Sequence, residues 1–566
     1  MFKILNFCKL TLIQLLIFFS FFSNINASNL YKNYSSKEIS NYFLGIISLS
    51  DNEYENSYKF LKKLEGLEQN HSRYSRVYIN SLVNLNKINQ AFKYSKKLEK
   101  ENLDNFESNF IISVFYFKNQ KPELAKNYLE KIKTKFILDP VQDYLVNSML
   151  RWVQLNSLSF AEAEKLFDFD RENFKNVKAI EKVFLYCYFK RKNTSSLFEN
   201  LLFGSDGNFS RYNFFFANYL HKIKKNNRAK EIINKSLIEY PNNLILNQMK
   251  FDLKNKKKFN NKFNCEELTN ISAEIFYVIS NALSSQQFFN YSNFYLNLAK
   301  YLNPNFISYN TLIAENLYIS GKLSAAKIKF NNILFYGDAY EWYAAKQIAS
   351  ILNEEKKEKL SIDFLSNKFK KIDNPSIYQI YDYASFLKNK EKFEVSIIYY
   401  TKVLDLIDNK HKLYPKAKDG RGISYERTDQ WKKAEKDFLD SLKFDSEQAY
   451  VINYLAYSWI EKGINIEKAL SMLKKANELK RNDGYITDSL GWAFFKLKRY
   501  TEAEKYLQLA VKLMPSDPIV NDHYGDTLWM NGKKLQARFY WKYVLNLEGT
   551  KKKLKEELNE KLIFGL

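Results

Sequence analysis

Glycine, proline and cysteine are all scarce in this chain of 566 residues, which has 15 glycines, 8 prolines and 3 cysteines. Average proteins contain about 7% glycine and about 5% proline. A β-sandwich or barrel needs many tight turns, and an α/β enzyme needs glycine-rich loops, so the composition argues against both. Hydrophobic residues make up 46% of the chain, which is enough to form a core and excludes wholesale disorder. We therefore expect a mostly helical protein.

Motifs that carry catalytic chemistry are also missing. The sequence contains none of the patterns G-x-x-x-x-G-K-[ST], G-x-G-x-x-G, G-x-S-x-G, H-E-x-x-H or C-x-x-C. Among the four histidines, His523 stands beside Asp522 and one helical turn from Asp526. A packing role explains this histidine better than a metal site or a general base. We expect no enzyme activity, cofactor, metal or small-molecule substrate.

The N-terminus has the features of a secretory signal peptide. Lys3 and Lys9 accompany an apolar run from Leu10 to Phe22, and Ile25-Asn26-Ala27 offers a cleavage site. The run is shorter than the roughly 20 residues that a membrane-spanning helix needs. We expect a cleaved signal peptide at 1–27 and a protein that is periplasmic or associated with the outer membrane. The alternative is an uncleaved anchor in the inner membrane.

Positive charge is in excess, with 87 Lys and Arg against 63 Asp and Glu and a formal net charge of +24. Such an excess could attract an anionic membrane, a wall polymer or nucleic acid. The lysines are spread along the chain, although they are densest at 254–262, and this spread favours a general compositional bias. Export makes nucleic acid an unsuitable partner, whereas peripheral membrane association stays open.

Two cysteines follow the N-terminal segment, Cys187 and Cys265, and they fit no metal-ligand spacing. A disulfide between them could form in an oxidising compartment. The sequence alone favours two buried free thiols.

A recurring spacing of small residues is the clearest pattern. Gly491, Ala503, Ala510 and Pro515 are separated by steps of 12, 7 and 5 residues. A small residue in one helix lets a second helix cross closely, and a step of 7 keeps two positions on one side of a helix. A proline then ends the second helix. The same steps recur, in whole or in part, at Gly45/Ser57/Leu64, Ala217/Ala229/Ser236/Pro241, Ser280/Ser292/Ala299/Pro304, Ala314/Ala326/Ile333, Gly422/Ala434/Ser441 and Gly525/Ala537/Val544.

The length of the repeating unit suggests a family. Ala469, Ala503 and Ala537 are each 34 residues apart, and Tyr485–Pro515 closely resembles the tetratricopeptide repeat. The resemblance is strong over 415–550, moderate over 210–243 and 273–410, and weak over 38–139. The whole chain resembles the long secreted tetratricopeptide proteins of Gram-negative bacteria.

The resemblance implies an all-α fold, an α-solenoid wound as a right-handed superhelix of about 14 helix pairs. Each pair contacts mainly its neighbours, so the ends of the stack need caps. The expected parts are the signal peptide at 1–27, a divergent helical-repeat array at 28–243, an irregular seam at 244–272, a tetratricopeptide array at 273–550 and a capping helix at 551–566.

Proteins of this family bind peptide segments in a concave groove lined by the first helix of each pair. When the last four units are aligned on their small residues, a polar residue recurs three positions earlier, at Asp419, Asn453, Asp488 and Asp522. We call these four positions the ladder. Their oxygen atoms could hold an extended peptide through its N–H groups. Further candidates for the peptide-binding groove follow the small residue: Tyr457, Trp492, Asp526 and Trp529.

A purely structural role stays open for all of these residues, because the ladder could bridge neighbouring first helices and Trp492 could pack between units. The family's preference for acidic peptide termini depends on lysines and arginines. The ladder is acidic or neutral, so we expect a basic or backbone-directed ligand instead.

The sequence thus predicts a noncatalytic scaffold or adaptor of the bacterial cell envelope with protein partners. One alternative is a basic peripheral binder of anionic membrane or wall polymer. Another is a regulatory subunit that tethers an enzyme, which the sequence cannot distinguish from an adaptor.

Overall fold

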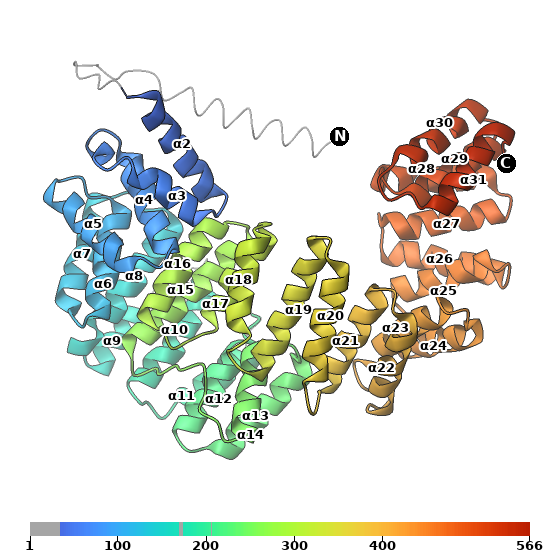
Figure 1. Cartoon of the computed structure of the whole chain (residues 1–566). Coiled ribbons are helices and arrows are strands. Elements are labelled where there is room, and N and C mark those ends of the chain that lie inside the picture. The colour runs from blue at the N-terminus through green and yellow to red at the C-terminus, as the bar shows by residue number, and fades with distance from the viewer. Residues whose placement is uncertain (1–33, 169–173, 205–206) are drawn as a thin grey trace. The chain divides into compact units, whose positions relative to one another are not determined.

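The computed structural model describes residues 34–168, 174–204 and 207–566 (Figure 1). The regular elements in these ranges are α-helices and two short 3-10 helices, and the extended pairing there is one isolated bridge between Asn261 and Phe306. The prediction of an all-α solenoid is therefore confirmed. No helix within these ranges is both long and apolar enough to cross a bilayer. The predicted signal peptide at 1–27 lies outside the described residues.

The chain forms two compact units that divide between Tyr340 and Glu341, inside α19. The helices of the first unit pack mainly in consecutive pairs, with α14 as an unpaired member. They are α2 (Ser36–Ser50), α3 (Tyr54–Lys62), α4 (Ser72–Asn84), α5 (Ile88–Lys100), α6 (Phe106–Lys118), α7 (Pro122–Lys135), α8 (Pro140–Gln154), α9 (Phe160–Phe167), α10 (Lys175–Tyr188), α11 (Thr194–Phe203), α12 (Tyr212–Lys222), α13 (Asn226–Glu239), α14 (Leu244–Lys254), α15 (Leu268–Ser285), α16 (Phe289–Leu302), α17 (Tyr309–Ile319) and α18 (Leu323–Ile333), with 3-10 turns η2 (Leu67–Gln69) and η3 (Leu155–Ser157).

The second unit continues the same pairing and ends in a single helix, α31, which packs on α30. Its helices are α19 (Asp338–Glu354), α20 (Glu358–Lys370), α21 (Ile377–Asn389), α22 (Phe393–Asp405), α23 (Tyr414–Glu426), α24 (Trp431–Phe444), α25 (Ala449–Glu461), α26 (Ile466–Leu479), α27 (Gly484–Lys496), α28 (Tyr500–Leu513), α29 (Pro518–Met530), α30 (Lys534–Asn546) and α31 (Lys552–Phe564).

The step of 12 residues marks the place where two helices of a pair cross. The Ser57 hydroxyl on α3 donates a hydrogen bond of 2.8 Å to the carbonyl of Gly45 on α2. At Gly491 on α27, a Cβ atom would lie 2.6 Å from the Leu507 side chain on α28, so only hydrogen fits there. The same hydroxyl-to-carbonyl bond over 12 residues recurs from Ser292 to Ser280 and from Ser361 to Ala349.

The turns inside the pairs explain how so few glycines suffice. These turns use one residue in the left-handed conformation, which glycine supplies at Gly321 (φ 74°) and Gly532 (φ 78°). At Asn86 (φ 60°) and Lys498 (φ 59°) a residue with a side chain takes the same conformation. Asparagine tolerates it well, and the packing of each pair imposes it elsewhere.

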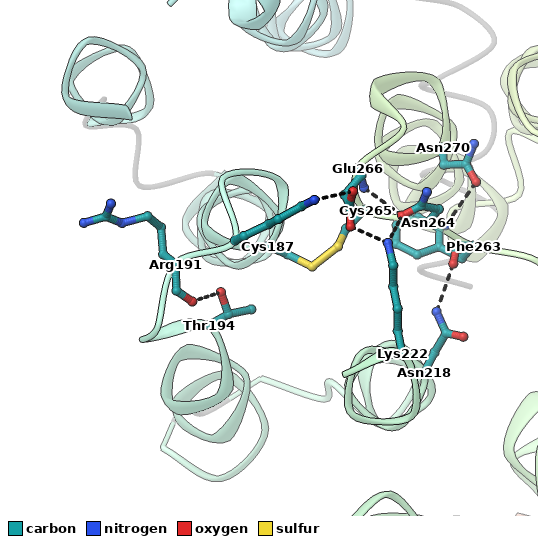
Figure 2. Close-up of a disulfide and its surroundings, with 11 residues drawn as sticks. Cys187, Arg191, Thr194, Asn218, Lys222, Phe263, Asn264, Cys265, Glu266 and Asn270 are labelled. Atoms are coloured by element: carbon teal, nitrogen blue, oxygen red, sulfur yellow. Dashed lines mark hydrogen bonds and ion pairs between the residues drawn. A yellow bond between two sulfur atoms is a disulfide. The ribbon is translucent and has the colours of Figure 1, made fainter. Parts of the chain in front are cut away.

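Residues 255–267 contain no helix and join α14 to α15; we call this segment the strap. A disulfide between Cys265 on the strap and Cys187 on α10 ties it to the first unit (Figure 2). The two Cα atoms are 5.9 Å apart, within the usual range of about 4.4–6.8 Å. The preference for two free thiols is therefore wrong. The contact between α10 and α15 brings the cysteines together across 78 residues of sequence.

Candidate peptide-binding face

The residues predicted to bind peptide lie on the first helices of the last four pairs of the second unit. Asp419 is on α23, Asn453 and Tyr457 are on α25, Asp488 and Trp492 are on α27, and Asp522, Asp526 and Trp529 are on α29. Neighbouring first helices touch each other at α25 with α27 and at α27 with α29. We call the side of these helices that carries the ladder the first-helix face.

The first two ladder positions lack donors. The Asp419 carboxylate forms no hydrogen bond or ion pair with any described residue. Burial raises its pKa to about 6, although Lys388 acts in the opposite direction. The buried Oδ1 atom of Asn453 also has no hydrogen-bond partner among the described residues. A buried acceptor without a donor is costly, as at Asn453, and the partly exposed Asp419 carboxylate also lacks a donor, so both positions suit a ligand that brings N–H groups.

The third ladder position is paired within the chain. The Nδ1 atom of His523 on α29 lies 3.1 Å from both carboxylate oxygens of Asp488. Burial lowers the pKa of His523, but Asp488 and nearby carboxylates raise it more, so the pKa ends above its usual value. His523 therefore bridges α29 to α27, which is the packing role that the sequence favoured.

Trp492 packs beside this bridge. Its indole stacks on the His523 ring with centroids 3.9 Å apart and planes inclined by 12°. Its ring also stacks on Phe495 at 4.6 Å, and its Nε1 atom donates a 2.5 Å hydrogen bond to Glu461 on α25. Trp492 is thus nearly buried between repeats, whereas Tyr457 is half-buried, with a pKa that burial raises.

The fourth ladder position is occupied by the capping helix. The Lys561 ammonium group on α31 lies 2.7 Å from Asp522 Oδ1 and 2.7 and 2.8 Å from the two oxygens of Asp526. Trp541 Nε1 donates a further 2.9 Å hydrogen bond to Asp526. Burial and the neighbouring Asp522 raise the pKa of Asp526 to about 6, against the effect of Lys561. The chain itself therefore fills the ligand position at this end.

Trp529, one helical turn beyond Asp526, is half-buried at the same end of the face. Its ring packs against Trp541 with centroids 5.4 Å apart, and the Arg538 guanidinium lies 4.9 Å from its centre. A Cβ atom on Gly565 would overlap the Trp529 ring, so the C-terminal tail also rests on it. Trp529 is therefore held by packing contacts within the chain.

Sequence reasoning missed an exposed apolar row beside the ladder. Tyr450 and Tyr485 are each 59% exposed, and Ile519 is 48% exposed. Each stands three residues before a ladder position, so it lies on the same face of its helix. Large residues recur three positions before the ladder in the sequence, and this recurrence could have identified the row.

One segment of the second unit matches a known family in sequence. A family model described as tetratricopeptide repeat matches residues 489–517, which contain all the landmarks from Gly491 to Pro515. The chain therefore contains a tetratricopeptide repeat in its second unit. Repeats of this kind form protein-protein interaction scaffolds. Within the described ranges, no group of three or more His, Cys, Asp or Glu side chains is placed to hold a metal.

A tetratricopeptide repeat-containing protein of Pseudomonas aeruginosa is 27% identical to this chain over 106 residues. The match spans 19% of this chain and 18% of the relative's length.

Two solved structures are similar in fold. The anaphase-promoting-complex Cut9–Hcn1 structure covers 93% of this chain and 97% of its own at 14% identity and a TM-score of 0.37. The structure of YrrB, described as having an unusual peptide-binding site, covers 33% of this chain and 92% of its own, at 18% identity and a TM-score of 0.27. At these scores neither likeness carries an argument about how this chain works.

Proposed function

We propose that this protein is a noncatalytic adaptor that binds an extended basic peptide segment on the first-helix face of α23 and α25. The observation that carries the proposal is the difference between the two halves of the ladder. Asp488 and Asp522 are paired with a histidine and a lysine of the chain itself. Asp419 and Asn453, at the equivalent positions, have acceptor atoms without donors among the described residues.

The contacts of Asp488 and Asp522 within the chain indicate which ligand groups would suit Asp419 and Asn453. A histidine fills the acidic position on α27 and a lysine fills it on α29, so a lysine or arginine of a partner would complete Asp419 in a similar way. Asn453 can accept a backbone N–H of the same segment. The exposed Tyr450 ring, one turn from Asn453, offers a rigid anchor at low entropy cost.

Binding of a labelled, extended lysine-rich peptide to the full chain tests this site by fluorescence anisotropy. The variant Asp419→Asn with Tyr450→Ala should bind at least about tenfold more weakly, since it removes one charged contact and one aromatic anchor. Glu447→Gln is the matched control, because it removes one exposed charge next to α25. Equal binding by both variants, or no binding by the unaltered chain, would contradict the proposal.

We also place this function in the cell envelope. The support is the signal-like N-terminus together with the Cys187–Cys265 disulfide, a bond typical of oxidising compartments. Fractionation of a Gram-negative host and the mass of the mature N-terminus test the location. Cytoplasmic recovery of a chain with an intact N-terminus would overturn it. Retention on anionic vesicles at low salt, with no protein partner in crosslinked cells, would favour the alternative of a peripheral binder.

A further inference from the structure

A pocket of about 730 Å³ lies beside the strap in the first unit. The strap forms one wall, and the ends of α6, α12 and α16 and the start of α15 form the rest. The volume falls in the range of about 300–1,000 Å³ that is common for ligand sites. This pocket belongs to a different compact unit from the first-helix face, so it constitutes a separate candidate site.

The lining of the pocket is strongly basic. Lysines 118, 256, 257, 258 and 262 contribute to it, and Glu267 is the carboxylate among its lining residues. Lys118 is held at the edge, where its Nζ atom donates a 2.7 Å hydrogen bond to the carbonyl of Leu302. Lys256, Lys257 and Lys258 are exposed, so their ammonium groups are accessible from solvent.

The strap that carries most of these lysines is fixed at several points (Figure 2). The disulfide holds Cys265, and the Asn218 amide of α12 donates a 2.9 Å hydrogen bond to the carbonyl of Phe263. The Asn303 amide donates a 3.1 Å bond to the carbonyl of Lys262. Lys222 on α12 donates a 2.7 Å bond to the Asn264 side chain. Nearer the exposed lysines, the Lys257 backbone N–H donates a 2.9 Å hydrogen bond to the carbonyl of Asp252 on α14. Both ends of the strap are therefore held in place within the chain before any ligand binds.

We propose that this pocket binds an acidic peptide segment of a partner protein. Lysine ammonium groups are compact point charges, and here they are distributed along the strap, which matches a row of carboxylates. Arginine, which recognises phosphate by paired parallel hydrogen bonds, is absent from the described residues of the lining. The pocket also exposes Phe259 and Pro304, apolar surface that suits a peptide better than a polyphosphate or an acidic sugar polymer.

The inference goes beyond the adaptor function and does not rest on it, because it involves other residues and a ligand of opposite charge. A labelled ten-residue peptide of alternating glutamate and leucine is the probe, with the oxidised full chain and an anisotropy readout. Lys256→Glu with Lys258→Glu should weaken binding at least about tenfold, by reversing two contacts. Lys552→Glu with Lys553→Glu, on exposed positions of α31, changes the net charge equally and should weaken it less than threefold.

The outcomes separate the proposal from its competitors. Equal weakening by the two charge reversals would show attraction by net charge alone and overturn the pocket. Absence of binding to the unaltered chain would overturn it as well. If polyphosphate or anionic vesicles bind in a strap-dependent manner and the peptide does not, the peptide assignment is wrong and another anion takes the site.

The disulfide provides a second test of the same site. Cys187→Ser with Cys265→Ser should retain the helical far-ultraviolet spectrum but bind the acidic peptide several-fold more weakly, because the lysines would no longer be held in place. Unchanged affinity in this variant would refute the role of the ordered strap. If the double variant does not fold, the paired lysine reversals still decide whether the pocket binds.

Discussion

The substitution Lys561→Met tests how much α31 stabilises the second unit by neutralising the carboxylates of α29. The substitution keeps a long side chain and removes the ammonium group that bonds to Asp522 and Asp526. The side chains are 10% and 6% exposed for the two aspartates and 17% exposed for Lys561. Removing one partner of a buried ion pair destabilises a protein by about 3–5 kcal/mol. Because Lys561 is partly exposed, we expect a loss of stability of about 3 kcal/mol.

The loss of stability caused by Lys561→Met should be larger at high pH than at low pH. The pKa of Asp526 is raised to about 6 in the folded chain, above the value of about 3.9 in an unfolded one. A carboxyl group with a raised pKa contributes stability that is present at low pH and is lost as pH rises through about 6. Without Lys561 that pKa rises further. The destabilisation by Lys561→Met should therefore be large at pH 7.5 and shrink at pH 5, where protonation neutralises Asp526.

Hydrogen exchange on the full chain measures this effect locally, as the opening free energy of amides in α29 and α30 after correction for intrinsic exchange at each pH. Lys552→Met is the control, because Lys552 is exposed on the same helix and should change the opening free energy by less than about 0.5 kcal/mol. Equal losses in the two variants, or a loss for Lys561→Met that does not shrink at pH 5, would refute the reasoning.

Three further predictions concern the repeat, the ladder and the disulfide. Gly491→Val should lower the exchange protection of α27 and α28 by about 1–3 kcal/mol through overpacking, whereas full protection would show that the crossing can relax. Asp419→Asn should stabilise the second unit by about 1–3 kcal/mol above pH 6, since the raised pKa of that carboxyl costs stability there, and equal stability of both chains is expected at pH 4. Cys187→Ser with Cys265→Ser should speed exchange across the strap, consistent with a typical disulfide contribution of about 2–4 kcal/mol, and leave α27 to α30 unchanged; a matching change in those helices would mean that the effect is global.

The repeating part of the fold could be predicted because its contacts recur at fixed separations. Ser57 meets Gly45 across 12 residues, and the same separation joins Ser292 to Ser280 and Ser361 to Ala349. A single sequence therefore samples the same packing rule many times. The disulfide and the Lys561 cluster occur once each, across 78 residues and across 35 and 39 residues. No periodic signal accompanies them, so sequence reasoning could not assign those partners.

The ladder shows the same limit within one motif. Asp419 and Asp488 occupy equivalent positions and look alike in the sequence. Asp488 lies within hydrogen-bond distance of His523, whereas Asp419 is influenced by Lys388 without forming a hydrogen bond or ion pair with a described residue. The repeat fixes where each ladder side chain stands. Its charge partner comes from a residue that is not repeated, and that partner decides whether the position is free for a ligand.

The two proposed sites differ in charge, and this difference can be used to separate local contacts from the net charge of +24. If the binding of a basic peptide is governed by Asp419 and Asn453, the strap reversals Lys256→Glu and Lys258→Glu should leave its affinity unchanged. If net charge governs the binding, the same reversals should strengthen it, because they make the chain less positive. The converse holds for the acidic peptide, whose affinity should be unaffected by Asp419→Asn. Independence in both directions would support two specific sites on separate compact units and a scaffold that can join a basic segment to an acidic one. If the strap reversals instead strengthen basic-peptide binding at low salt, and the effect disappears at about 0.15 M, long-range attraction explains both sites. Charges more than about 8 Å apart are screened at that ionic strength.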